Sequence, residues 1–291
     1  MPQAGQVRIG ISGWTYPPWR GVFYPKGLAQ KRELEFTSSQ FRSLEINGTF
    51  YGMQRPDAFA DWAERAPEGF VFAVKAPRYI THLRRLRDID APLANFFASG
   101  VLELRAKLGP ILWQFPPNLR FDETLWREFL ERLPRDTASA RAIARGHDAR
   151  VRATSIPRID NARLRHAVEV RSETFRDERF IALLRRNKVA LVVADTAGRW
   201  PYLEDVTADF VYLRLHGDKE IYASGYSKRA LDRWAERIDA WRNGREPADA
   251  ARESAKGAPK RSRRDVYCYF DNDIKVRAPF DAEALRERLE R

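Results

Sequence analysis

Charged and amide side chains recur at alternate positions in several short stretches of this 291-residue sequence. The clearest is the predicted strand 43–50, in which Glu45 and Asn47 lie on one side and Leu44 and Ile46 on the other. We expect the apolar side to be buried and the polar side to direct a carboxylate and an amide into a shared space. Other polar groups at or near the ends of such stretches are Lys75, Gln114, Glu169, Arg171, Arg214, His216 and Asn272.

Three of these side chains, Glu45, Glu169 and His216, are candidates for proton transfer. A histidine titrates near neutral pH, and crowding can raise the pKa of a carboxylate toward the same range. Lys75 is a further catalytic candidate, because a poorly solvated lysine can act as a Schiff-base nucleophile. The pattern therefore favours an enzyme that uses acid-base chemistry.

The cationic side chains Lys75, Arg171 and Arg214 favour an anionic ligand. A guanidinium group can hold two oxygens of a carboxylate or phosphate at once. We therefore expect a small anionic substrate. The other predicted binding residues are Asn47, Gln114, Asn272 and Trp14.

A divalent metal is an alternative, because Glu169, Asp195 and His216 stand at the ends of three successive predicted strands. Two carboxylates and an imidazole form a usable ligand set for such an ion. This order resembles that of the xylose-isomerase-like and apurinic-endonuclease-like barrels. The resemblance would imply a metal-dependent hydrolase or isomerase, whereas no other cofactor is implied.

Those barrels add an acidic ligand on the eighth strand, where this sequence offers Asp271, Asn272 or Asp273. Against a metal, Arg171 and Arg214 lie two residues from Glu169 and His216 on the same predicted strands. They would repel a cation or occupy the carboxylates. Both hypotheses stay open at this point.

A structural role is the alternative for each polar residue taken singly. Buried ion pairs of Glu45 with Lys75 and of Glu169 with Arg171 could fill a barrel without any catalysis. Unpaired buried charges are costly, so mutual pairing is expected whatever the function. For the whole set, however, so many polar groups at one end of a barrel describe a pocket better than a core. The sequence also lacks a nucleotide-phosphate loop, a Gly-x-Ser-x-Gly elbow and a His-Glu-x-x-His motif.

The elements that must position these residues are eight short strands, most of them followed by a helical pattern. This count and the chain length predict a single domain, residues 1–291, folded as a (β/α)8 TIM-type barrel. An open doubly wound sheet is the second choice, but it usually needs a glycine-rich phosphate turn. The predicted strands are 7–11, 43–50, 70–76, 111–115, 166–171, 189–194, 210–215 and 266–270. The predicted helices include 56–65, 92–107, 123–133 and 177–187, one capped by Ser227 and a last one capped by Asp281.

The formal net charge of +12 is concentrated in two segments that interrupt the strand-helix rhythm. Residues 135–165 hold eight Arg and three Asp, and residues 242–264 hold eight Lys or Arg and three acidic residues, so each segment carries a net charge of +5. We interpret both as insertions or flexible loops. A non-catalytic protein that binds nucleic acid or another anion through these segments is therefore a further alternative, although solubility explains the charge equally simply.

The N-terminus has no signal-peptide pattern, and no apolar run is long enough to span a bilayer. The single cysteine, Cys268, excludes an internal disulfide and a cysteine-cluster metal site. We therefore expect a cytoplasmic protein that does not bind membranes. The oligomeric state and the substrate are not predicted by these features.

Several motifs resemble those of one known family. They include Ile-Gly-Ile-Ser-Gly-Trp at 9–14, Glu-Ile-Asn-Gly-Thr-Phe-Tyr at 45–51, Thr-His at 81–82, His-Ala-Val-Glu-Val-Arg at 166–171, Tyr-Leu-Arg-Leu-His-Gly at 212–217 and Tyr-Phe-Asp-Asn-Asp at 269–273. Together they cover nearly the whole chain, which resembles the YecE-like family, domain of unknown function 72. The resemblance implies a TIM-type barrel with Glu45, Asn47, Lys75, Glu169, Arg171, Arg214 and His216 facing its interior. It implies no particular reaction, because the family has none agreed.

Overall fold

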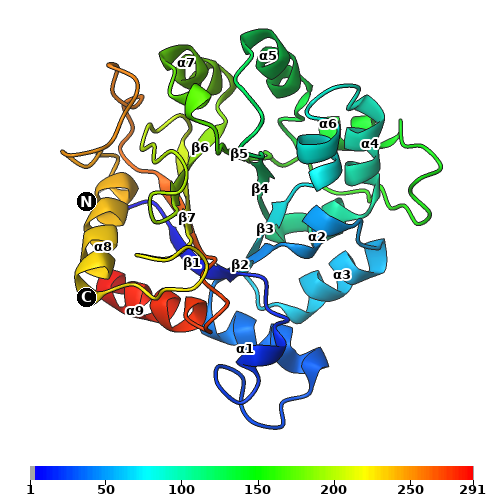
Figure 1. The fold of residues 1–291 in the computed structure, drawn as a ribbon. Coiled ribbons are helices and arrows are strands. Elements are labelled where there is room, and N and C mark those ends of the chain that lie inside the picture. Colours follow the sequence, from blue (N-terminus) through cyan, green and yellow to red (C-terminus); the bar gives the residue numbers. More distant parts are fainter. Residues whose placement is uncertain (1–3, 291) are drawn as a thin grey trace.

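In the computed structural model, which describes residues 4–290, eight parallel strands close into a barrel (Figure 1). Each strand pairs with the next one along the chain, and the last pairs with the first. The predicted TIM-type barrel is therefore confirmed. The strands are β1 Val7–Ser12, β2 Ser43–Ile46, β3 Val71–Lys75, β4 Leu108–Gln114, β5 His166–Glu169, β6 Ala190–Asp195, β7 Phe210–Leu215 and β8 Asp265–Phe270.

Helices surround the strands on the outside of the barrel (Figure 1). One begins at the predicted cap Ser227, which accepts a hydrogen bond from the Ala230 amide. Another begins at Asp122, which accepts a hydrogen bond from the Leu125 amide. Within the described residues, β6 and β7 are joined by a loop, 196–209, that contains no helix. The helices are α1 Glu33–Gln40, α2 Gly48–Tyr51, α3 Pro56–Arg65, α4 Asp90–Ala98, α5 Glu123–Arg132, α6 Thr137–Ala144, α7 Glu178–Asn187, α8 Lys228–Arg242 and α9 Ala278–Glu290.

The barrel has two apolar layers, because side chains alternate between its interior and the surrounding helices. The outer layer holds the large buried tryptophans Trp113, Trp126 and Trp234. The alternation determines which residues of each strand face inward, and therefore which polar groups can meet at the C-terminal end. The interior layer consists of Val71, Ala73, Leu112, Ala167, Ala190, Val192, Ala194, Ala208, Phe210, Tyr212, Tyr267 and Tyr269.

The predicted strand 43–50 is wrong in its second half. β2 ends at Ile46, Asn47 has helical backbone angles (φ −91°, ψ −23°), and the next four residues form the short helix α2. The Thr49 hydroxyl donates hydrogen bonds to the carbonyls of Ile46 and Lys75. These bonds hold the chain in a turn across the end of β3, which the alternating sequence pattern does not reveal.

Two predicted helices also differ from the structure. The helix expected over 92–107 is broken at Gly100, whose positive φ of 104° ends α4, and a 3-10 stretch, Val101–Lys107, follows. The last helix begins at Ala278, so Asp281 lies inside its first turn and does not cap it. Its carboxylate instead accepts hydrogen bonds from the Tyr226 amide and the Asn272 side chain.

The two basic segments differ from each other. The first contains α6, which the sequence did not predict; Asp136 and Ser139 form a reciprocal capping box at its start. The second has no helix between the end of α8 and β8 among the described residues, but its backbone is bonded to the carboxylates of Glu204 and Asp205. Figure 1 shows the loops 151–163 (green) and 250–262 (orange) on opposite sides of the barrel.

Candidate active site

Arg214 is the centre of a polar cluster at the C-terminal end of the barrel. It lies on β7 at an interior position and is fully buried. Its guanidinium donates to Glu45 (3.1 and 2.9 Å), to Glu169 Oε2 (2.8 Å) and to Asp271 Oδ2 (2.8 Å). One cation is therefore shared by three carboxylates from β2, β5 and the end of β8. The predicted ligand-binding Arg214 has most of its donors occupied by the protein itself.

Glu45 is held in place by further buried donors. Its Oε1 accepts a hydrogen bond from the Ser12 hydroxyl (2.8 Å), and its Oε2 accepts one from the Tyr212 hydroxyl (2.6 Å). Burial, reinforced by the negative charge of Glu45, raises the pKa of Tyr212 well above its ordinary value. Tyr212 is therefore a permanent donor, and Glu45 is positioned by the barrel interior below the mouth.

Glu169 joins the two predicted arginines. Its Oε1 accepts a hydrogen bond from Arg171 Nε (2.8 Å), while its Oε2 accepts the bond from Arg214. Burial alone would raise the pKa of Glu169, but the charges of Arg171 and Arg214 outweigh it and hold this pKa well below the ordinary value. The Arg171 guanidinium stacks on the Trp200 ring at 3.7 Å from the centroid, and its Nη2 donates to the Tyr222 hydroxyl (3.3 Å).

His216 lies between two of the carboxylates. Its Nδ1 is 3.0 Å from Asp271 Oδ2, and its Nε2 is 3.8 Å from Glu169 Oε2. Burial would raise the pKa of Asp271, yet Arg214 and His216 hold it well below its ordinary value. The imidazole thus lies between two ionised carboxylates.

Lys75 ends β3 inside the same mouth and is 7% exposed. Its Nζ lies 4.2 Å from the centroid of the Phe50 ring and makes no hydrogen bond or ion pair with the described part of the chain. Burial, followed by the charge of Arg214, lowers the pKa of Lys75 to about 8, although Asp271, Glu45 and Glu169 oppose this shift. The pairing of Glu45 with Lys75, which a purely structural role would require, is therefore not formed.

Asn47 and Trp14 lie together on one side of the mouth. They line a cavity of about 290 Å³, which Tyr16 and Trp62 also border. Trp14 packs edge-to-face on Trp62, with ring centroids 5.3 Å apart. The Oδ1 atom of Asn47 is buried and has no hydrogen-bond partner among the residues described. A ligand in this cavity could supply the missing donor to Asn47.

Gln114 faces the interior beside His82, a residue absent from the predicted site. The Gln114 Nε2 is 3.4 Å from His82 Nε2 and donates to the Phe115 carbonyl (3.1 Å). Burial, followed by the charges of Arg171 and Lys75, lowers the pKa of His82 to about 4. His82 is therefore a neutral imidazole at the mouth; the Thr-His motif at 81–82 was the sequence signal for it.

Asn272 and Asp195 point away from the cluster. In the alternation of their strands, both residues fall at positions that face the surrounding helices. Asn272 donates hydrogen bonds to the Ser224 carbonyl and to Asp281. Asp195 accepts a hydrogen bond from the Tyr226 hydroxyl (3.2 Å). The neighbour Asp271 takes the place in the cluster that we had given to Asn272. The period of two along Tyr267, Tyr269 and Asp271 would have identified it.

Asp273 is a second acidic residue that the catalytic prediction missed. It is partly buried near Tyr16, and burial, with the charge of Asp271, raises its pKa to about 6. Its pKa therefore lies closer to neutral pH than is usual for an aspartate. No local pattern distinguishes it from its neighbours, because the shift arises from the tertiary surroundings.

The predicted metal set Glu169, Asp195 and His216 is not assembled, because Asp195 faces the helices. Asp271 stands near the other two, but Glu169 and Asp271 are already bonded to Arg214. Over residues 4–290, no group of three or more His, Cys, Asp or Glu side chains is arranged to hold an ion. The metal set named from the sequence is therefore not formed in this arrangement, and we derive no chemical step through a metal.

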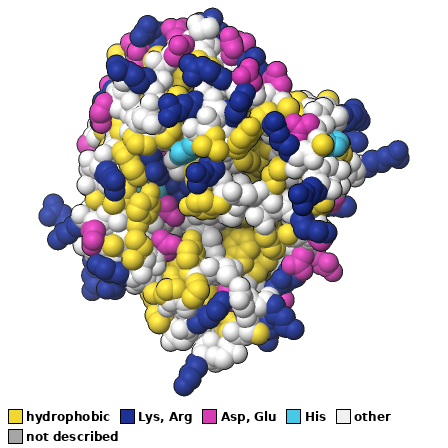
Figure 2. All heavy atoms as spheres, turned by 45° about the vertical axis from the view of Figure 1, so that its right-hand side comes forward, with side chains coloured by type: hydrophobic (Ala, Val, Ile, Leu, Met, Phe, Trp, Pro, Cys, Tyr) yellow, Lys and Arg dark blue, Asp and Glu magenta, His cyan; other side chains and the backbone are white. Residues whose placement is uncertain are grey.

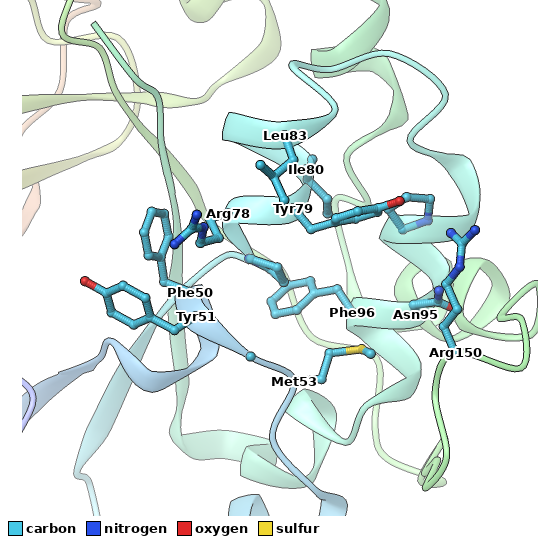
Figure 3. A pocket seen from close by; sticks show the side chains of 13 residues that line it. Phe50, Tyr51, Met53, Arg78, Tyr79, Ile80, Leu83, Asn95, Phe96 and Arg150 are labelled. Carbon is cyan, nitrogen blue, oxygen red and sulfur yellow. The ribbon is translucent and has the colours of Figure 1, made fainter.

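A hydrophobic cavity of about 450 Å³ lies beside the mouth, between α2 and α4. Figure 3 shows Met53, Tyr79 and Phe96 around it, with Phe50 and Arg78 at one end. The face drawn in Figure 2 carries hydrophobic areas around a hollow that shows both acidic and basic side chains. Phe50 forms a wall of this cavity and also contacts Lys75 Nζ, so the cavity and the polar cluster are neighbours.

The family model described as "Protein of unknown function DUF72" matches residues 8–291. The chain belongs to the DUF72 family. It is 29% identical to the UPF0759 protein YecE of Escherichia coli over 130 residues, which are 44% of each chain, and 32% identical to the UPF0759 protein YunF of Bacillus subtilis over 116 residues, 38% of this chain and 40% of YunF. These matches span less than half the length of either relative.

Solved structures of DUF72 proteins share the fold along almost the whole chain. A DUF72 protein from Thermotoga maritima has a TM-score of 0.72 and 24% identity, with 98% of this chain and 100% of that chain covered. One from Enterococcus faecalis has a TM-score of 0.66 and 16% identity, with coverage of 98% and 96%. At these identities the likeness shows the fold alone. In residues 4–290 no helix has both the length and the apolar character needed to cross a membrane.

Proposed function

We propose that this DUF72 protein is an enzyme that acts on a small anionic molecule by acid-base chemistry at the C-terminal mouth of its barrel. The observation that carries the proposal is the state of Lys75, a buried amine without a protein partner beside a cluster of ionised carboxylates. A self-sufficient structural cluster would pair this group, since an unpaired buried charge is costly. Groups with perturbed pKa values gather at functional sites for this reason.

The arrangement divides the predicted residues into two roles. Arg214 and Glu45 hold each other and are sealed from solvent, so they position the cluster. Lys75, Glu169 and His216 are the catalytic residues of the proposal. When an anion binds, the side chains of Lys75, Glu169 and His216 would change their contacts, whereas the hydrogen bonds of Arg214 would stay the same.

Arg171 is the residue we assign to binding the anion. Glu169 and Tyr222 engage its Nε and Nη2, and the Trp200 ring supports its flat face. Its Nη1 has no hydrogen-bond partner among residues 4–290, and its side chain is 12% exposed. A guanidinium fixed in this way loses little freedom when it binds an oxygen.

Calorimetric titration with inorganic phosphate, glyoxylate and pyruvate tests the proposal. We expect Arg171→Met to weaken the binding of the preferred anion by about tenfold to a hundredfold, since a hydrogen bond to a charged group is worth about 1.5–3 kcal/mol. Arg127→Met is the matched control, because Arg127 pairs with Glu123 on the surface of α5. Equal binding in the wild type and Arg171→Met, or no binding of any of the three, would refute the proposal.

A second candidate is the non-catalytic binding of nucleic acid or another polyanion. The observation that favours it is a polar cavity of about 470 Å³ at the N-terminal end of the barrel, lined by Arg165 from one basic segment and Arg261 from the other. Asp209 and Asp265 share this cavity and offset part of its charge. The binding of single-stranded DNA should weaken steeply with salt and fall in Arg261→Ser; binding that ignores both changes would exclude this candidate.

The metal-dependent alternative has its own test. Elemental analysis of protein purified without a tag or chelator, repeated on His216→Ala, would show whether an ion is bound at this mouth. A near-stoichiometric ion that the variant loses would favour the metal-dependent hydrolase or isomerase.

A further inference from the structure

Lys75 differs from the buried Arg214 and from the partly buried Lys107 in what surrounds its terminal nitrogen. Arg214 donates to three carboxylates, and Lys107 donates to the carbonyls of Ala63 and Ala66 (2.5 Å each). Lys75 Nζ instead faces the Phe50 ring, and no donor bond from it is formed within residues 4–290. Its lone pair, once the amine is neutral, is not engaged by the protein.

The neighbouring charges do not neutralise Lys75. Glu45 on β2, Glu169 on β5 and Asp271 after β8 each bond to Arg214 on β7, which itself repels the ammonium. With a pKa of about 8, about one molecule in ten carries the neutral amine at pH 7, far more than for an exposed lysine. The site therefore supplies a nucleophilic nitrogen close to physiological pH.

We propose that Lys75 forms an imine with an aldehyde or ketone that carries an anionic group, so that the substrate of this enzyme is an anionic carbonyl compound. This inference rests on the function proposed above and names the substrate class for it. Arg171 would bind the anionic group, and Lys75 Nζ would attack the carbonyl carbon. The Phe50 ring stabilises the cationic imine, as it does the ammonium, through its π-face.

The reaction balances without an oxidant or a cofactor. The lysine ammonium first gives up one proton. The neutral amine then adds to the carbonyl carbon while a proton passes from the nitrogen to the carbonyl oxygen, which gives a neutral carbinolamine. This intermediate takes the first proton back on its hydroxyl group and loses water. In sum, a lysine ammonium and a carbonyl compound give a protonated imine and one water molecule.

Reductive trapping tests the imine. The full-length protein is incubated with glyoxylate, pyruvate or glycolaldehyde phosphate in the presence of sodium cyanoborohydride, and adducts are located by peptide mass spectrometry. We expect at least one of these compounds to modify Lys75 at least tenfold faster than the exposed Lys228. The rate at Lys75 should level off above pH 8, where its amine is largely neutral.

Matched variants make the result specific. Lys75→Met removes the amine without removing a hydrogen bond, so the rapid modification seen at Lys75 in the wild type should be lost. Lys228→Arg should keep this rapid modification. Modification of the exposed lysines with no excess at Lys75 would overturn the proposal. That reading comes from the wild-type protein, so it stands even if a variant fails to fold.

Separate measurements test the formation of the imine and the proposed function. Calorimetry with the same compounds, but without the reductant, reports anion binding. Binding that requires Arg171, without an adduct at Lys75, would overturn the imine and leave acid-base chemistry on an anion. Trapping at Lys75 that Arg171→Met does not slow would overturn the assignment of an anionic substrate.

Discussion

The protein bonds the polar atoms of His166 and Lys107 at the N-terminal end of the barrel, but not the amine of Lys75 at its C-terminal mouth. At the N-terminal end, His166 uses both ring nitrogens: Nδ1 accepts from Trp113 Nε1 (3.0 Å) and Nε2 bonds the Pro134 carbonyl (2.7 Å). Lys107 is likewise satisfied by two carbonyls. Both side chains therefore have partners for their polar atoms, His166 as a buried residue and Lys107 as a partly buried one.

At the mouth, some polar atoms lack such hydrogen bonds. Arg214 is saturated, but Lys75 Nζ and Asn47 Oδ1 have no partners among the described residues. The comparison teaches that burial alone does not mark a functional site in this barrel. Buried atoms without partners also occur elsewhere, as at Arg264 Nε and Nη1 before β8. The mouth is distinguished by an unpaired amine, Lys75, beside the ionised carboxylates of Glu169 and Asp271. The following predictions can break or sharpen that contrast.

The largest effect is expected from Arg214→Met. The substitution leaves Glu45, Glu169 and Asp271 together without their shared cation, so we expect the free energy of unfolding to fall by about 3–5 kcal/mol. Urea denaturation at neutral pH measures this loss. Arg127→Met, which removes an exposed surface pair, should change little. A small loss for Arg214→Met would mean that the cluster does not hold the mouth together.

The two lysines should respond in opposite directions. Lys107→Met leaves two carbonyls without their donor and should lower the free energy of unfolding by about 1–3 kcal/mol. Lys75→Met removes an unpaired ammonium and should be neutral or stabilising at pH 7. Equal destabilisation by both substitutions would remove the contrast between the two ends.

The pH dependence of stability checks the same contrast at Lys75. Its pKa is lower in the folded state, about 8, than in the unfolded state, 10.5. The unfolded chain therefore binds more protons in this interval, and the stability of the wild type should rise from pH 8 to 10.5. The free energy of unfolding of Lys75→Met, measured at the same pH values, should lack this contribution.

The buried His166 should lower the stability of the protein in acid. Burial, aided by the charge of Arg135, lowers its pKa to about 4 from 6.5, so the folded state holds it neutral. Stability should be fully present above pH 6.5 and be lost as the pH falls toward 4, by about 1–3 kcal/mol. His166→Gln should flatten this slope, although His82 titrates over the same interval. His147→Gln, at the surface, is the control, and an unchanged slope in His166→Gln would contradict the prediction.

The sequence was sufficient for the barrel and for most of the inward-facing polar residues. Where polar and apolar residues alternate, as in β7, the period of two predicted that Arg214 and His216 share the interior. β6 is apolar up to Asp195, so no alternation shows which of its residues face the interior. The prediction that Asp195 joins the residues of the mouth is therefore wrong. At β8 the phase was present in Tyr267 and Tyr269, but Asn272 was chosen over Asp271.

The sequence by itself determined which side chains each strand offers, because the facing of a side chain depends on local backbone geometry. Only the tertiary structure decided which of them meet. Barrel closure brings Glu45 within 2.9 Å of Arg214, 169 positions away, and gives the one guanidinium to three carboxylates. Lys75 is left unpaired as a result, since the carboxylates that it could pair with are already bonded to Arg214. The local sequence does not show that Arg214 and Lys75 compete for these carboxylates.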